Sequence, residues 1–185
     1  MIFQNNPTVA LHVTREGLTG YTKSGKNGHS QKLSFPPEVV RNLEVVDQPQ
    51  LAKLVATFAA ENKLHGQRVV ILLDDSVIFQ KIVPAAEEIK QPGVVADFEH
   101  KVPFDPEKRR VITLHPKDQL VILGTNRVLY ETIATALQTV GAKVLAAAPM
   151  AIYGKGKGGQ LNRETLAPVL NDTRRAEAAN FLHVN

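Results

Sequence analysis

The sequence predicts a mixed α/β fold in which parallel and antiparallel strands occur together. Three observations carry the prediction. Residues 7–23 alternate apolar and polar side chains on both sides of a short turn, as a β-hairpin does. Residues 69–73 form a continuous apolar run of strand length, typical of a buried strand. Apolar residues recur at helical spacing over 48–63 and 126–140, between the strand-like segments.

The N-terminal third predicts a hairpin, a third strand and a helix. Asn27-Gly28 tolerates positive φ and predicts a tight turn before a strand over 29–33. Asp47 is followed three residues later by Gln50, the spacing of a capping box, so we expect a helix over 48–63.

The rest of the chain alternates strand and helix patterns and ends in a helical tail. Pro92 suits the first turn of a helix over 92–101, and Gly141 ends the helix over 126–140. The segment GKGKGG, residues 154–159, is the clearest linker. Strands are expected at 67–75, 76–84, 109–116, 118–125 and 142–148, and tail helices at 162–171 and 172–182.

Composition excludes several classes of protein. The 185 residues include no cysteine, so disulfides and thiolate metal sites are excluded. No apolar run approaches the roughly 20 residues that span a bilayer, and we expect no signal peptide. The formal charge of +4 favours a solvated basic surface first, a membrane or acidic-protein contact second and nucleic acid last. The ten aromatic residues are not interleaved with basic ones as a nucleic-acid stacking platform requires.

No catalytic constellation is visible in the sequence. The glycine-rich segment lacks the Lys-Ser/Thr of a phosphate loop, and no two of the six histidines stand at metal-ligand spacing. His12 is expected on the polar face of its strand. Asp74-Asp75 follows a buried strand and predicts a turn, with a metal site as the alternative. The basic run at 108–110 predicts protection of an edge strand, with an acidic partner as the alternative.

Four stretches, taken together, resemble the N-terminal half of the PilM-like proteins, the actin-like components of type IV pilus assembly. The resemblance covers roughly residues 8–153 and rests on the order and spacing of the motifs. They are the hairpin VALHVTREGLTGYTKSGKNG, the helix and strands of LAKLVATFAAENKLHGQRVVILLDDSVIFQKIVPA, the short helix of ADFEHKVPF, and LVILGTNRVLYETIATALQTVGAKVLAAAPMAI.

The resemblance implies a truncated actin-like, ribonuclease-H-like fold with a smaller inserted α/β subdomain. The core subdomain would comprise residues 1–65 and 142–153. Residues 66–141 would form the insertion and a return helix, 154–161 a linker, and 162–185 the helical tail. The cytoplasmic domain of the type II secretion protein GspL is a relative of the family.

Two departures from the family argue against nucleotide binding. ATP-binding members carry an Asp-x-Gly/Ser-Ser type loop in the first hairpin, whereas residues 14–17 here are Thr-Arg-Glu-Gly. The chain also has about half the length of a complete actin-like fold, whose second half supplies another phosphate loop and the adenosine pocket. We therefore expect a non-enzymatic protein without a cofactor or a bound metal.

The function that the resemblance implies is that of a cytoplasmic scaffold, peripheral to or tethered at the inner membrane. Its partner would be PilN, a bitopic inner-membrane protein, or another platform component of a pilus or type II secretion system, and self-association is also expected. The candidate partner contacts, chosen from charge and strand placement, are Phe79, Lys81, Lys108, Arg109 and Arg110. In the tail, Arg174 and Arg175 would lie near an anionic leaflet if a membrane segment followed residue 185; a plain solvated helix is the alternative.

Two other functions remain open at this stage. A reduced actin-like phosphotransferase would bind ATP and Mg²⁺ through Asp74 or Asp75. A basic nucleic-acid-binding module would show steeply salt-dependent binding, although the placement of the aromatic residues argues against it.

Overall fold

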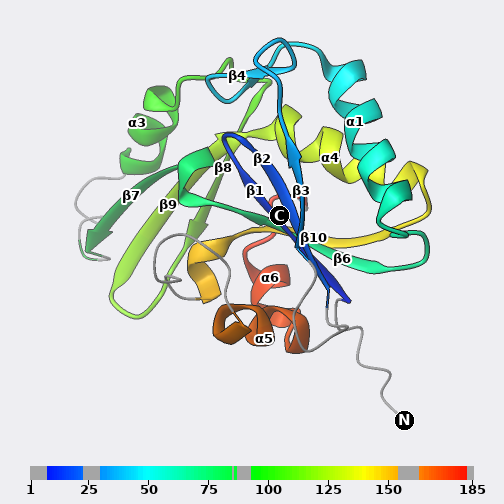
Figure 1. Ribbon diagram of the computed structural model, residues 1–185. Helices are drawn as coiled ribbons and strands as arrows, with labels where there is room; N and C mark the ends of the chain where they lie inside the picture. The colour runs from blue at the N-terminus through cyan, green and yellow to red at the C-terminus, as the bar shows by residue number, and fades with distance from the viewer. Residues whose placement is uncertain (1–7, 23–29, 85, 87–92, 154–162, 183–185) are drawn as a thin grey trace.

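The computed structural model describes residues 8–22, 30–84, 86, 93–153 and 163–182, in a five-stranded sheet, a three-stranded sheet and a two-stranded ribbon (Figure 1). The large sheet has the order β10-β6-β1-β2-β3. Strands β1, β2 and β3 pair antiparallel, as the predicted hairpin and third strand require, while β6 and β10 run parallel to β1. The bounds are Val9–Thr14 (β1), Gly17–Thr22 (β2), Ser30–Ser34 (β3), Arg68–Leu73 (β6) and Lys143–Pro149 (β10).

Helices cover both faces of the five-stranded sheet (Figure 1). On one face lie α1 (Gln48–Glu61) and α4 (Arg127–Thr139), which pack on each other and on the main core. On the other face lie α5 (Arg163–Asn171) and α6 (Arg174–Ala178). The predicted capping box is present in part, because the Asp47 carboxylate accepts a hydrogen bond from the backbone N–H of Gln50 at 2.9 Å.

The three-stranded sheet has the order β7-β9-β8 and is antiparallel throughout. The short helix α3 (Val94–Lys101) packs on one face of this sheet and closes a small separate core around Phe98, Phe104 and Ile122. The single-turn helix η1 (Asp75–Val77) leads into the sheet from β6, and α4 leads out of it. Its strands are Ile78–Pro84 (β7), Arg109–Leu114 (β8) and Gln119–Asn126 (β9).

The expected mixed α/β fold with a smaller inserted α/β layer is confirmed, and the segment 66–141, predicted to form the insertion and a return helix, contains elements of both parts. Strand β6 pairs with β1 in the large sheet, and α4 packs on α1, so both belong to the core. The inserted layer therefore lies between η1 and α4. The continuous apolar sequence of β6 indicates that the strand is buried, but it does not indicate which sheet the strand joins.

One element was not expected, a ribbon formed by β4 (Val40–Arg41) and β5 (Glu44–Val45). Its turn residues Asn42 and Leu43 have φ of 51° and 68°, which is uncommon for a branched residue such as leucine. Leu43 packs against both the main core and the core of the inserted layer. The Asn126 side chain, which caps α4, donates to the Leu43 carbonyl at 2.9 Å and holds this turn against the junction of the two sheets.

The C-terminal segment is integrated into the core. Phe181 is fully buried, packs its ring at a tilt against that of Tyr130 and donates its backbone N–H to the Ala147 carbonyl at 2.8 Å. Another single-turn helix, η2 (Met150–Tyr153), follows β10, and Tyr153 donates to the Asp172 carbonyl at 3.2 Å. Among the described residues, no helix is long and apolar enough to cross a membrane. The predicted linker at 154–161 lies outside the described residues, as do Asn27 and Gly28.

Candidate functional site

A polar groove with a cavity volume of about 580 Å³ runs along strand β8. Residues 109–114 of β8 form its floor. One wall comes from α3 and the loop after it, through Val95, Glu99 and Pro106. The other wall comes from Arg127 at the start of α4 and from residues 177–180 at the end of α6. The groove therefore lies where the inserted layer meets the core.

Strand β8 is an edge strand and presents unpaired backbone groups to this groove. The Lys108 carbonyl accepts from the N–H of Arg127, which follows β9, at 2.6 Å. Because backbone groups point to alternate sides of a strand, residues 110, 112 and 114 then face β9, and Val111 and Thr113 face outward. The described residues form no hydrogen bond with the outward backbone groups of Val111 and Thr113. An exposed edge of this kind is a template for adding a strand.

Two neighbouring arginines of β8 project to opposite faces of the inserted sheet. The Nε atom of Arg109 lies 3.4 Å from a carboxylate oxygen of Glu99 on α3. The Arg110 guanidinium instead interacts with the hydroxyl of Tyr130 on α4. Burial raises the pKa of Tyr130 to about 12, and the arginine opposes this only in part. A chain laid along the edge would thus have a guanidinium on each side.

The structure brings together only some of the predicted partner contacts. Arg109 and Arg110 line the groove, whereas Lys108 lies next to it and pairs with Asp105 at 2.9 Å, a contact that raises the pKa of Lys108. Phe79 and Lys81 lie on β7, the opposite edge of the same sheet. The Phe79 ring packs edge-on against Phe104, 5.8 Å away, and so contributes to the core of the inserted layer.

The two tail arginines lie on α6, outside the groove lining. Arg174 is 87% exposed and binds the Asp172 carboxylate at 3.0 Å, which lowers the pKa of Asp172. Arg175 is also exposed. Of this helix, Glu177 and Ala178 reach the groove.

The turn of the first hairpin is occupied by contacts within the protein. The Glu16 backbone N–H donates to the Thr14 hydroxyl at 3.2 Å, and the Arg15 N–H donates to the Ser76 hydroxyl at 3.3 Å. These are two of the N–H groups that a phosphate at this turn would need.

His12 was expected on a polar strand face, and this is wrong: its side chain is buried and pairs with Asp74. The distance from His12 Nε2 to Asp74 Oδ2 is 3.0 Å, and His12 is 4% exposed. Asp74 Oδ1 accepts from the Ser76 N–H at 2.8 Å and begins η1, so the predicted turn is confirmed. Burial alone would raise the pKa of Asp74, but the hydrogen bonds from Ser76 and His12 outweigh it and lower the pKa.

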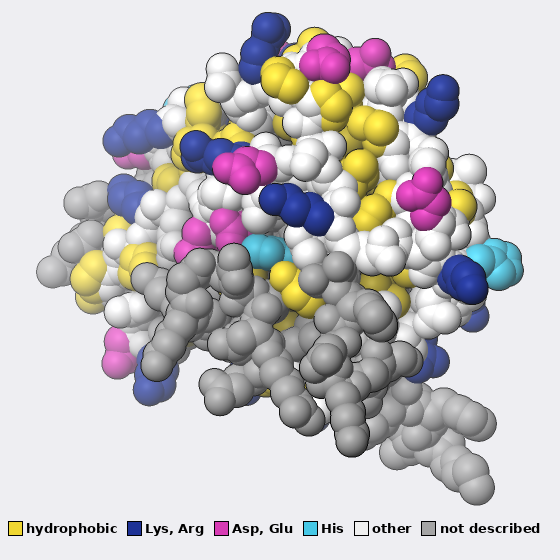
Figure 2. All heavy atoms as spheres, viewed as in Figure 1, with side chains coloured by type: hydrophobic (Ala, Val, Ile, Leu, Met, Phe, Trp, Pro, Cys, Tyr) yellow, Lys and Arg dark blue, Asp and Glu magenta, His cyan; other side chains and the backbone are white. Residues whose placement is uncertain are grey.

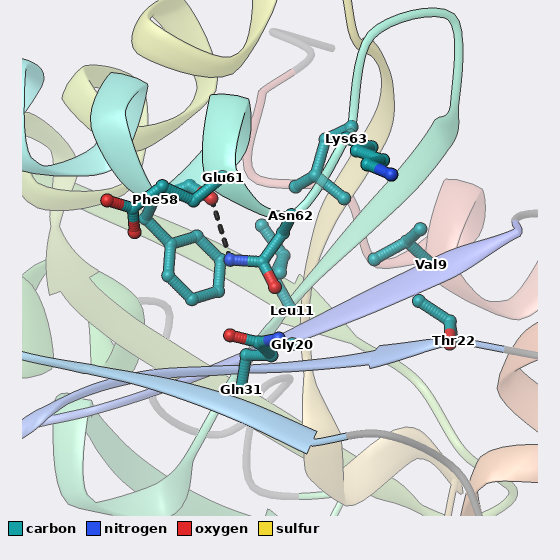
Figure 3. A pocket seen from close by; sticks show the side chains of 10 residues that line it. Val9, Leu11, Gly20, Thr22, Gln31, Phe58, Glu61, Asn62 and Lys63 are labelled. Carbon is teal, nitrogen blue, oxygen red and sulfur yellow. Dashed lines mark hydrogen bonds between the residues drawn. The ribbon is translucent and has the colours of Figure 1, made fainter.

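A second hollow lies between the end of α1 and the first three strands, with a volume of about 360 Å³ (Figure 3). Leu11 and Phe58 form an apolar floor, and the Asn62 amide donates to the Phe58 carbonyl at 2.7 Å. Val9 and Thr22 place the hollow at the end of the hairpin away from its turn. It therefore includes no residue of the hairpin turn at 14–17.

Charged side chains of both signs are interspersed over the described part of the face seen in Figure 2. No single-sign field of the kind that attracts a nucleic acid is visible on this part of the surface. Among the described residues, no group of three or more metal-binding side chains is present.

The fold is shared with known structures. A chain of the PilM-PilN type IV pilus biogenesis complex matches 80% of this chain and 48% of its own length, with a TM-score of 0.53 and 17% identity. The cytoplasmic domain of EpsL, an inner membrane component of the type II secretion system of Vibrio cholerae, matches 80% of this chain and 59% of its own, with a TM-score of 0.48 and 13% identity. A Bacteroides thetaiotaomicron protein of unknown function with an actin-like ATPase fold matches 82% and 55%, with a TM-score of 0.43 and 16% identity.

The first of these structures confirms the predicted resemblance at the level of the fold. The chain spans about half the length of the structures that it matches. No protein-family model matches the sequence, and no curated protein matches it.

Proposed function

We propose that this protein is a non-enzymatic scaffold of a type IV pilus or type II secretion assembly platform, and that it binds an extended segment of a partner in the groove along β8. The proposed partner is a PilN-like bitopic inner-membrane protein, whose cytoplasmic segment would lie along the free strand edge. The protein would then act on the cytoplasmic side of the inner membrane, recruited by this partner.

The observation that carries the proposal is the unpaired edge of β8 inside a groove. The outward N–H and C=O groups of Val111 and Thr113 offer hydrogen bonds to a bound strand, and the walls supply side-chain contacts on both sides. Addition of a strand to an exposed sheet edge is a common mode of peptide recognition. The fold shared with a chain of the PilM-PilN complex supports the choice of partner.

A proline substitution tests this mode directly. Thr113→Pro removes one outward N–H from the groove, at an exposed position of an edge strand where proline is tolerated. We expect the affinity for the cytoplasmic peptide of the PilN-like protein, measured by calorimetry, to fall about tenfold, because one backbone hydrogen bond is lost and the ring obstructs the edge.

The opposite edge of the same sheet provides the matched control. By the same alternation Gln80 faces outward on β7, so Gln80→Pro removes an equivalent N–H outside the groove. The affinity of Gln80→Pro for the peptide should stay within about twofold of that of the wild type, because surface substitutions usually change free energies by no more than about 0.5 kcal/mol. Equal loss in the two variants would refute the β8 site, and loss only in Gln80→Pro would assign the partner to the edge that carries Phe79 and Lys81.

Charge reversal examines the basic run separately. If Arg109 and Arg110 flank the bound segment, their replacement by glutamate should weaken binding, while Lys108→Glu should have a smaller effect because Lys108 lies outside the groove lining.

The proposed membrane proximity of Arg174 and Arg175 is measured by a separate experiment, namely sedimentation of the protein with anionic vesicles. The double variant Arg174→Glu, Arg175→Glu should sediment less if it is correct.

A further inference from the structure

Strand β7 forms the edge of the inserted sheet opposite to the groove and lies at the periphery of the molecule (Figure 1). It pairs with β9 along all of its seven residues. By the same alternation as on β8, the backbone groups of Gln80 and Ile82 point away from β9, and the described residues form no hydrogen bond with them. Pro84 ends the strand and has no N–H to donate. The free part of this edge is therefore short, and Ile82 lies within it.

Ile82 is the open end of an apolar row that crosses the inserted sheet. Its side chain is 54% exposed, and among the described residues Val46 is the other large apolar side chain of this exposure class. Val83, the next residue, belongs to the core under α3, so Ile82 lies on the opposite face of the sheet. On that face Ile82 pairs with Val121 of β9, which pairs in turn with Leu114 of β8. Val121 and Leu114 are partly buried against the main core, whereas Ile82 has no neighbouring strand beyond it.

The free edge is complementary to itself in one register. A second copy of β7 can pair antiparallel with the first about a twofold axis, and directly opposed residues then lie on the same face. With Ile82 opposite Ile82 of the second copy, the apolar rows of the two sheets join end to end. The outward N–H of each Ile82 then faces the carbonyl of the other, and the N–H of Gln80 faces the carbonyl of Pro84.

Neighbouring registers are less favourable. A register centred on Lys81 places two ammonium groups directly opposite each other, which destabilises a strand pair. A register centred on Gln80 places Ile82 opposite Ile78, whose N–H already donates to the Asp75 carbonyl. Neither register joins the two apolar rows, so the sequence of the edge selects the pairing centred on Ile82.

We infer that the β7 edge is an interface between two copies of this chain, which pair through Ile82 and join their inserted sheets into one. A second copy fits this edge because it supplies the matching apolar row through its own Val121 and Leu114. The twofold contact closes on itself and gives a dimer. The groove along β8 stays open in each copy, so the dimer would present two grooves at the two ends of the joined sheet.

Sedimentation velocity tests the interface. The wild type should pass from monomer to dimer as its concentration rises, and the range should reach millimolar protein because so small an interface is weak. Ile82→Lys interrupts the apolar row and opposes two like charges, so it should weaken the dimer at least about tenfold. Val46→Lys is the matched control, because it makes the same kind of change at a side chain that is 51% exposed and lies outside the inserted sheet. A wild type that stays monomeric, or equal weakening by the two variants, would overturn the interface.

Disulfide crosslinking tests the register, because the chain contains no cysteine of its own. In the proposed register the two Cα atoms of residue 82 lie about 5.5 Å apart, within the range of a disulfide. Under mild oxidation Ile82→Cys should therefore crosslink faster than Lys81→Cys and Gln80→Cys. Thr113→Cys on the exposed edge β8 measures crosslinking by random collision. Faster crosslinking at residue 81 or 80 would overturn the register, and faster crosslinking at residue 113 would overturn the assignment to β7.

The partner peptide separates this inference from the proposed function. The sedimentation of the wild type requires neither a peptide nor a substitution, so a misfolded variant cannot hide the result. A dimer that binds no peptide would support the interface and refute the proposed function. A monomeric wild type whose Ile82→Lys variant loses the peptide would overturn the interface and assign this edge to the partner.

Discussion

Gly17, the first residue of β2, allows strand β3 to approach the hairpin closely. A Cβ atom at this position would lie 2.9 Å from Cα of Ser34 and in still closer conflict with the carbonyl oxygen of Leu33. Both obstacles are backbone atoms, so no side chain can rotate away. In Gly17→Ala, β2 and β3 must therefore separate at this end of the sheet.

The cost of this separation follows from the bonds that it breaks. The backbone pairing between Gly17 and Ser34 would be lost, as would the hydrogen bond from the N–H of Phe35 to the Glu16 carbonyl at 2.8 Å. At about 1 kcal/mol for each of two or three backbone hydrogen bonds, with some exposure of Phe35, the loss is about 3 kcal/mol. For a chain of this size that loss corresponds to a decrease in Tm of about 6–12 °C.

Thermal and urea unfolding measure this loss, and Gly66→Ala is the matched control. Gly66 has a φ of +72° and no atom within 4 Å of the Cβ position, so only the backbone conformation is penalised, at about 1 kcal/mol. If Gly17→Ala destabilises the protein no more than Gly66→Ala does, the close approach of β3 is not the reason for this glycine. The expected result would mean that Gly17 is needed for packing, so its presence in the hairpin does not indicate a phosphate site.

Three further predictions concern the core and the buried titratable groups. Phe181→Ala should lower the free energy of unfolding in urea by about 3–5 kcal/mol, because a fully buried ring is lost; a change below 1 kcal/mol would show that the C-terminal segment is not part of the core. The pKa of Tyr130 is raised to about 12 in the folded protein, against 10 in the unfolded chain, so its contribution to stability is complete below pH 10. About 3 kcal/mol of stability should be lost as the pH rises through 12, and absorbance at 295 nm should show the late ionisation of the tyrosine. The lowered pKa of Asp74 stabilises the protein above its ordinary value of 3.8 and less at lower pH, so the deficit of Asp74→Asn in urea should shrink as the pH falls below 4. A deficit independent of pH would exclude the ionised carboxylate as its cause.

The elements predicted well from the sequence are those fixed by neighbouring residues. The turn at Arg15 and Glu16 joins two strands whose alternation is local, and Asp47 caps α1 within three residues. The same holds for α4, whose apolar spacing and N-cap Asn126 lie on one short segment. Burial and backbone conformation can be predicted directly from local sequence patterns of this kind.

The elements missed are those decided by distant residues. His12 and Asp74 are 62 positions apart, and only the parallel pairing of β1 with β6 brings them together. The ribbon β4–β5 has two residues in each strand, too few for an alternating apolar and polar pattern to be recognised in the sequence. Of the groove, the sequence predicted Arg109 and Arg110 through their charge at a strand end, but Arg127 and Asn180 come from segments with no such signal.

The hydrogen bonds that polar groups form, or lack, at the two candidate sites favour a scaffold over a phosphotransferase. Of the two carboxylates considered for Mg²⁺, Asp75 is exposed in η1, whereas both oxygens of Asp74 already accept hydrogen bonds, from Ser76 and His12. Drawing Asp74 onto Mg²⁺ would leave the buried His12 without its partner, a cost of about 1–3 kcal/mol that metal binding would have to exceed. The groove, in contrast, offers outward backbone groups of β8 that form no hydrogen bond with the described residues. We therefore expect calorimetric titration with ATP and Mg²⁺ to give no micromolar binding and the partner peptide to bind, and micromolar binding of ATP would reverse this preference.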